Sequence, residues 1–179
     1  FLPVHLRIRH VSKEPLFVIG TLYENLVYGV DLGDKDRRPE RVLAICAQLD
    51  IEPETMKRIS AEPDADILPW NLLLAASTRH LLNMARGFIA NAEVLVIHKP
   101  FADLGPKTRP VICDALRNFV DHRGLENDPR HFYHRRPRTC IISVRPDEDV
   151  SFADEVHWPV AGKMKTNGAG SPVKAEPSI

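Results

Sequence analysis

The stretch that decides the fold is LAASTRHLLNMARGFIANAEVLVIHKP, which runs from Leu74 to Pro100. Its first part carries one apolar stripe at helical spacing, made of Leu81, Leu82, Ala85, Phe88 and Ile89. This stripe predicts a helix over residues 78–91. Residues 94–97 then form a short, continuous apolar run bounded by polar residues, which is typical of a strand buried on both faces of a sheet. A helix followed by such a strand favours an α/β fold with a parallel sheet.

The flanking sequence extends this pattern in both directions. Upstream, we expect an extended segment over 1–19 and a short helix over 20–30, followed by helices that begin at Pro39 and Pro53. Downstream, Pro106 begins a predicted helix that runs to Asp121. Two further buried strands are predicted, over 139–144 and over 156–160. The small, polar tail, 165–179, is expected to be disordered.

Composition limits the class of protein. The 179 residues are 44% apolar, which is enough for one domain with a sizeable core. Lys+Arg and Asp+Glu both total 24, so no net charge draws the chain toward nucleic acid or a membrane surface. Three cysteines without CxxC spacing argue against a disulfide framework or a zinc site and favour a reducing compartment. No apolar run approaches the roughly 20 residues of a transmembrane helix.

Three blocks of sequence together resemble the ATP-binding domain of ABC transporters. The stretch 74–100 is similar to the family segment that joins the LSGGQ signature, the following helix and the Walker B strand. Residues 11–15 (VSKEP) and 20–29 (GTLYENLVYG) resemble the Q-loop and the segment after it. Residues 139–143 and 152–164 resemble the switch-histidine strand and the terminal ADEI…GKI hairpin. The blocks occur in family order.

The resemblance implies a partial P-loop NTPase fold of the ABC type. Residues 1–164 would form a degenerate ABC ATPase-like domain that lacks the strand carrying the phosphate loop. Residues 20–92 would include the helical subdomain, and residues 93–164 would form the C-terminal part of the parallel-sheet core. Without the phosphate-loop strand, we expect a sheet with an exposed edge and an uncovered apolar face.

The residues that ATP hydrolysis needs are replaced at the matching positions. A phosphate loop of the form GxxxxGK[ST] is not in this sequence, where the only Gly-Lys pair is Gly162-Lys163, followed by Met164. The Walker B carboxylates align with His98 and Lys99. Carboxylate oxygens bind Mg²⁺, whereas an imidazole is poorly suited to it and a protonated lysine cannot act as a general base. We therefore expect no bound cofactor. A metal site at His98 is disfavoured because no His, Cys or carboxylate stands three or four residues away on either side.

The remaining family positions are changed in the same direction. Lys13 aligns with the Q-loop glutamine, and Val144 aligns with the switch histidine. The signature serine and two glycines align with Ala75, Ala76 and Ser77, and the D-loop aspartate aligns with Gly105. Alanine removes the signature hydroxyl, and side chains stand where close backbone approach to a phosphate needs glycine. The apolar core positions are kept while the catalytic polar positions are not.

Residues 122–138 (HRGLENDPRHFYHRRPR) form a basic insert where the family has a shorter loop. Five arginines of this basic insert are candidate partner contacts: Arg123, Arg130, Arg135, Arg136 and Arg138. One interpretation is a solvated surface loop. The other is contact with an acidic partner, and the sequence does not choose between RNA phosphate, a lipid headgroup and a protein.

The sequence leaves three functional hypotheses. The first is a catalytically inactive ABC-ATPase-like module that has a structural or interaction role with protein partners in a larger assembly. The second is a degenerate nucleotide-binding domain of an ABC transporter that pairs with a competent ABC-type domain. The third is an active ATPase with displaced acids, for which Glu93 and Asp103 lie nearest to the end of the Walker B strand. Organelle and transported substrate stay open.

Overall fold

The computed structural model describes residues 6–60, 69–160 and 163–168. The chain divides into two compact units, with the boundary between Ser143 and Val144, and each unit is described by itself. The first unit contains the strands β1 (Ile8–Val11), β2 (Val94–His98) and β3 (Thr139–Ser143). Its α-helices are α1 (Leu22–Leu26), α2 (Pro39–Gln48), α3 (Pro53–Ser60), α4 (Trp70–Leu73), α5 (Ala76–Ile89) and α6 (Thr108–Asp121). Its two 3₁₀ helices are η1 (Lys35–Arg37) and η2 (Pro129–His134).

The helices predicted from apolar spacing are all present. The helix α5 begins two residues before the predicted start, and α6 begins at Thr108 instead of Pro106. Proline begins both α2 and α3, as predicted. A capping box begins α1: the Thr21 hydroxyl accepts a hydrogen bond from the Glu24 backbone N–H, and the Glu24 carboxylate accepts one from the Thr21 backbone N–H.

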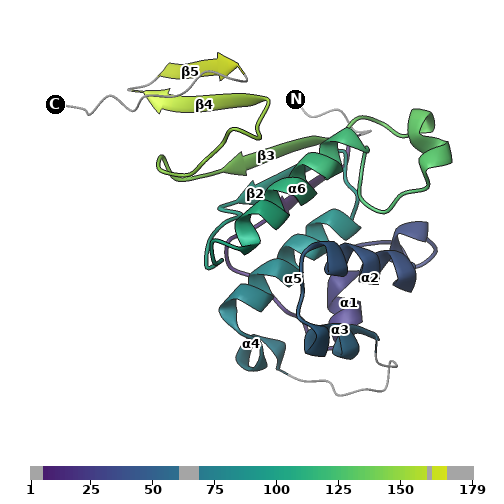
Figure 1. The fold of residues 1–179 in the computed structure, drawn as a ribbon. Helices are drawn as coiled ribbons and strands as arrows, with labels where there is room; N and C mark the ends of the chain where they lie inside the picture. Colours follow the sequence, from purple (N-terminus) through teal and green to yellow (C-terminus); the bar gives the residue numbers. More distant parts are fainter. Residues whose placement is uncertain (1–5, 61–68, 161–162, 169–179) are drawn as a thin grey trace. The chain divides into compact units, whose positions relative to one another are not determined.

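The three strands of the first unit form a parallel sheet in the order β1-β2-β3 (Figure 1). This topology confirms the predicted α/β class with a parallel sheet. The helix α5 packs against β1 and β2, and α6 packs against β3. Phe88 of α5 and Phe119 of α6 meet with their ring centroids 5.6 Å apart, and both are fully buried. These aromatic rings join the two helices that cover the sheet.

Helices cover one face of this sheet, and the opposite face is partly open. Leu95 and Ile97 of β2 point to the covered face and are buried. The strand register places Ile8, Val94, Val96 and Ile141 on the opposite face. There Ile8 is 42% exposed and Ile141 is 53% exposed, while the two valines are half-buried. The prediction that β2 is buried on both faces is therefore wrong for Val94 and Val96.

The strand β3 is an edge strand. Its side chains alternate between exposed and half-buried, so the prediction of a second buried strand is correct in position and wrong in environment. The backbone N–H of Thr139 donates to the Glu93 carbonyl of the neighbouring chain segment. Because backbone groups alternate in direction along a strand, the N–H groups of Cys140 and Ile142 point to the free edge. Among the described residues of the first unit, the expected exposed edge and uncovered face are thus both present.

The second unit contains an antiparallel hairpin of β4 (Glu155–Val160) and β5 (Lys163–Gly168). The strand predicted over 156–160 is present, but it is not buried as expected: His157 is exposed and Val156 and Trp158 are half-buried. The prediction of a disordered tail from Lys165 onward is wrong for Lys165–Gly168, because these residues pair with Glu155–Trp158. The rest of that predicted tail, 169–179, lies outside the described residues, as do residues 1–5 of the predicted N-terminal extended segment.

In the described part of the chain, no helix combines the length and the apolar character that crossing a bilayer requires.

Candidate functional site

The carboxyl ends of parallel strands are where α/β proteins place their ligand sites. At this edge, β2 ends in His98 and is followed by Lys99, and both side chains are exposed. Lys99 adopts a left-handed backbone conformation, with φ of 54°. Its backbone N–H lies 3.1 Å from the Ser143 carbonyl and 3.2 Å from the Ser143 hydroxyl oxygen, so the end of β3 holds the turn in place.

The residues present at this edge do not fit a Mg²⁺–nucleotide site. The end of β2 offers an imidazole and an ammonium group, where Mg²⁺ requires carboxylate oxygens. Lys13, two residues past β1, adds another exposed positive charge. Among residues 6–60, 69–160 and 163–168, no group of three or more His, Cys, Asp or Glu side chains is placed to hold a metal ion.

The start of α5 holds the residues that match the family signature. Ala75 is the N-cap residue and forms no side-chain cap hydrogen bond, and Ala76 and Ser77 begin the helix. All three are exposed or half-exposed. His80, four residues after Ala76, is buried, and its Nε2 lies 2.9 Å from the carbonyl oxygen of Pro100. The structure thus joins α5 to the turn after β2 through a residue that no motif indicated.

The remaining two predicted positions are Gly105, in the first unit, and Val144, in the second. Gly105 is exposed in the loop before α6, and a side chain built there would meet no atom within 4 Å. Val144 directly follows β3 and is the first residue of the second unit, so its place is described only along the chain. The positions brought together at one sheet edge are therefore Lys13, His98 and Lys99.

The two acids considered for a displaced active site have other environments. Glu93 precedes β2, at the opposite end of that strand from His98, and its carboxylate pairs with Arg7 at 3.2 Å. Asp103 is exposed in the turn before α6, with a left-handed φ of 60°. Glu93 is thus a partner of arginines within the fold.

The basic insert is organised around Phe132. The guanidinium of Arg123 lies 4.5 Å from the centre of the Phe132 ring, and that of Arg135 lies 5.7 Å from it. Arg123 also donates to the Arg135 carbonyl at 2.7 Å, and Arg135 donates to the Asp128 carbonyl at 2.8 Å. Two of the five arginines therefore hold the loop in its own shape.

The other three arginines of the basic insert differ in exposure. Arg130 is exposed and pairs with Asp128 at 2.9 Å. Arg136 is exposed as well. Arg138 is buried, with its Nη1 3.6 Å from a carboxylate oxygen of Glu93 and its Nη2 3.2 Å from the side-chain oxygen of Asn91. Partner contact by the insert stays a prediction, and the exposed cations that could make it are Arg130 and Arg136.

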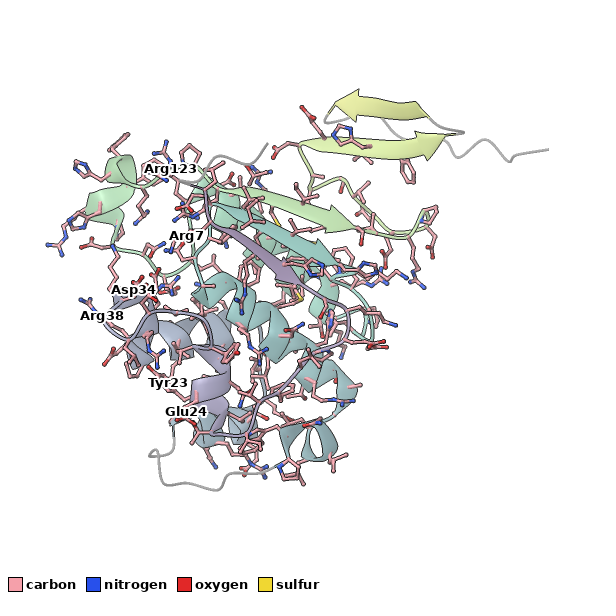
Figure 2. The ribbon with its side chains drawn as sticks, turned by 180° about the vertical axis from the view of Figure 1, so that it is seen from behind. Arg7, Tyr23, Glu24, Asp34, Arg38 and Arg123 are labelled. Atoms are coloured by element: carbon pink, nitrogen blue, oxygen red, sulfur yellow. The ribbon has the colours of Figure 1, made fainter. Side chains whose placement is uncertain are left out.

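A charged cluster at the amino ends of the strands was not foreseen from the sequence. Arg7, labelled in Figure 2 at the start of β1, donates to the Asn91 carbonyl at 2.9 Å and to Glu93. The side-chain amide of Asn91 in turn donates to the Asp36 carboxylate at 3.1 Å. Asn91 has a φ of 49°, which asparagine tolerates after a helix. This cluster links the start of the sheet to η1 of the helical part.

Arg41 completes the link from the helical side. This buried side chain donates to the carbonyl oxygens of Ile89 at 3.0 Å and Phe88 at 3.4 Å, at the C-terminus of α5. A cation there is favoured by the helix dipole and by the unpaired carbonyls of the last turn. Arg41 also lies 3.6 Å from the Asp36 carboxylate. Burial alone lowers the pKa of Arg41, and nearby Asp36 acts in the opposite direction.

Comparison with solved structures identifies the fold. The chain superposes on the ATP-binding cassette MJ0796, in a dimeric post-hydrolysis state bound to ADP and Pi, with a TM-score of 0.61 and 16% sequence identity. The match covers 92% of this chain and 64% of that chain. The fold is therefore that of an ABC-type P-loop NTPase over nearly all of this chain, as predicted, although the chain spans less than two thirds of the cassette.

Sequence comparison agrees with the structural match. Over 110 residues, the chain is 26% identical to ABC transporter B family member 17 of Arabidopsis thaliana. That alignment covers 62% of this chain and 9% of the relative. No protein-family profile matches the chain. Together, the sequence relative and the fold confirm the predicted resemblance to part of an ABC transporter nucleotide-binding domain.

Proposed function

We propose that this chain is a non-hydrolytic ABC-ATPase-like module that acts through its surfaces in a larger protein assembly. The observation that carries the proposal is the end of β2, which offers the imidazole of His98 and the ammonium group of Lys99. In the family resemblance, these two residues match the Walker B carboxylates. Loss of a single catalytic group typically costs about 10²- to 10⁴-fold in rate. In this chain, the residues that match the Q-loop, signature and switch positions of the family are replaced as well. Each of these replacements would slow the same reaction, ATP hydrolysis.

The open side of the sheet supports an interaction role. The uncovered face carries exposed Ile8 and Ile141, and β3 presents backbone groups at a free edge. Such an edge readily pairs with another strand, and exposed apolar surface is stabilised when a partner covers it. About a third of the matched cassette (100 − 64 = 36%) has no counterpart here. We propose that the missing part, a strand beside β3 with its packing helix, is supplied by another segment or chain.

Two measurements test this proposal. In the first, purified chain is assayed for steady ATP turnover with Mg²⁺, and we expect none above buffer. Turnover that disappears in the Asp103→Asn or Glu93→Gln variant would instead support an active ATPase with displaced acids. The variant Glu54→Gln is the control for loss of an exposed acid unrelated to the strands.

The second measurement addresses the assembly role. Amide hydrogen exchange is compared for the chain alone and for the complex that co-purifies with it from its natural source. In the chain alone, the amides of Cys140 and Ile142 should exchange fast, and in the complex they should become protected. A stable monomer that shows the same exchange with and without its co-purifying proteins would contradict the assembly role.

A degenerate nucleotide-binding domain that pairs with a competent partner is the second candidate. The matched cassette is dimeric, and α5 begins with exposed or half-exposed residues that a facing domain could contact. A cysteine introduced at Ser77 would form a cross-link to the phosphate loop of such a partner. If sequence precedes Phe1, it separates the two candidates, because a membrane domain followed by GxxxxGK[ST] favours the transporter interpretation.

A further inference from the structure

A small polar cavity lies between the end of β1 and the middle of α5. Its volume is about 150 Å³, and its lining includes Arg9, Ser12, Asn83 and Arg86. A single water molecule occupies about 30 Å³ in the liquid, so the cavity has room for an ion of several heavy atoms. None of the residues that line it is acidic.

Arg86 is buried in the wall of this cavity without a carboxylate. Its Nε donates to the Asn25 carbonyl at 2.7 Å, and its Nη1 donates to the Leu16 carbonyl at 2.7 Å. The guanidinium also lies 5.5 Å from the centre of the Phe17 ring. Within the described residues, Nη2 of Arg86 has no hydrogen-bond acceptor and the side chain forms no ion pair. Buried charges in proteins are normally paired, so this arginine is unusual.

Arg9 adds a second positive charge to the same cavity. It is half-buried, and its described hydrogen bond is a 3.3 Å contact from Nη2 to the Tyr28 carbonyl. Both arginines line this cavity. Burial, and after it the charge of Arg9, lower the pKa of Arg86, as expected for two like charges that lie near each other. An anion between them would remove this repulsion.

We propose that this cavity binds a small oxyanion of the phosphate or sulfate class between the guanidinium groups of Arg9 and Arg86. Guanidinium groups present paired N–H donors that match the oxygen spacing of such ions. Asn83, whose side-chain amide holds the Ser12 carbonyl at 2.9 Å, fixes the loop after β1 against α5 and so sets the width of the site. The site lies on the α5 side of β1, and it needs neither Walker B carboxylates nor a facing subunit.

The test is calorimetric titration of the full chain with sodium phosphate, sodium sulfate and sodium chloride at constant ionic strength. We expect saturable binding of phosphate and sulfate and none of chloride. Glycerol phosphate is titrated as well, to distinguish two sources of the anion. If only the free ions bind, the cavity takes free oxyanions. If the ester binds equally well, the cavity takes a phosphoryl group of a larger molecule.

Two variants localise the binding. Arg9→Gln should weaken phosphate affinity about tenfold or more, because it removes one charge-assisted contact. Arg9 is suited to this change since its described hydrogen bond is long and accepted by exposed Tyr28. Arg58→Gln is the matched control, because Arg58 lies on α3 in an exposed pair with Glu54. Its phosphate affinity should equal that of the wild type.

Two results would overturn the proposal. One is an equal response to phosphate and chloride, which would mean general screening of charge. The other is wild-type phosphate affinity in Arg9→Gln. Backbone amide shifts at Ser12 and Gly87 provide an independent readout, since both residues line the cavity and should shift in the wild type and not in Arg9→Gln.

Discussion

Nε2 of His80 lies 2.9 Å from the carbonyl oxygen of Pro100, and this contact bonds α5 to the turn that follows β2. The carbonyl can only accept, so the imidazole carries its proton on Nε2 in this interaction. His80 is 1% exposed. The helix α5 and the turn after β2 are therefore held together by a buried contact, whereas His98 and Lys99 next to that turn are exposed.

Replacing His80 tests this internal connection. His80→Ala removes the hydrogen bond to Pro100 and leaves a cavity, so we expect the free energy of unfolding to fall by about 2 to 4 kcal/mol. His98→Ala is the control at an exposed position, where a change within about 0.5 kcal/mol is expected. Urea denaturation measures both. Equal stability of the two variants would show that the His80 contact contributes nothing.

Arg41 should be among the most sensitive charged residues. Arg41→Gln leaves Asp36 buried without its ion pair and frees the last carbonyls of α5, so a loss of about 3 to 5 kcal/mol is expected. Arg58→Gln removes an exposed pair with Glu54 and should cost about 0 to 1 kcal/mol. Thermal and urea unfolding compare the two. A small effect of Arg41→Gln would mean that water replaces the guanidinium at the helix end.

Stability should depend on pH through Glu93. Burial acts to raise the pKa of this carboxyl, but hydrogen bonds from the Arg7 side chain and backbone outweigh it and hold the pKa below its ordinary value. A lowered pKa in the folded state stabilises the fold above the unfolded pKa of about 4.3, and this contribution disappears as the pH falls through the folded value.

We therefore expect the wild type to lose more stability than Glu93→Gln when the pH is lowered from about 6 to about 3. The measurement is the free energy of unfolding as a function of pH. Glu54→Gln, which removes an exposed acid, should keep the wild-type slope. Parallel curves for the wild type and Glu93→Gln would refute the linkage.

Gly87 allows α5 to lie close to the sheet. A Cβ atom there would be 2.6 Å from Cγ2 of Val11 and 3.2 Å from Cδ1 of Leu95. Alanine favours a helix by up to about 1 kcal/mol over glycine, but overpacking costs about 1 to 3 kcal/mol. Gly87→Ala should thus destabilise the domain by about 1 to 2 kcal/mol. Gly105→Ala, where the space is open, should be neutral within about 0.5 kcal/mol, and a stabilising Gly87→Ala would show that β1 shifts freely.

Local spacing and start signals predicted most elements of this fold. The apolar stripe of α5, the prolines that begin α2 and α3 and the apolar run of β2 are properties of neighbouring residues, and the structure confirms them. The environment of each strand was harder to predict. Apolar composition does not distinguish a central strand from an edge strand, so β3 was expected to be buried although Ile141 is 53% exposed.

The candidate sites divide in the same way. His98 and Lys99 were found because they align with a motif on a strand that periodicity also located. Arg86 and Arg9 come from segments 77 positions apart (86 − 9), and no local pattern indicates that they line one cavity. The clearest available signal for the amino-end cluster was Asn91 directly after a helix, since asparagine often adopts the left-handed conformation there.

The parallel register of β1 with β2 affects the order in which the chain can fold during synthesis. Arg7 and Glu93 bond across 86 positions of sequence, so β1 leaves the ribosome long before its partner strand exists. At roughly 5 to 20 residues per second, this delay is about 4 to 17 s. Through that time, the backbone of β1 has no β2 to pair with. Of the three described strands of this sheet, β1 is thus made before the others and paired late, and it is the one that a chaperone would need to protect.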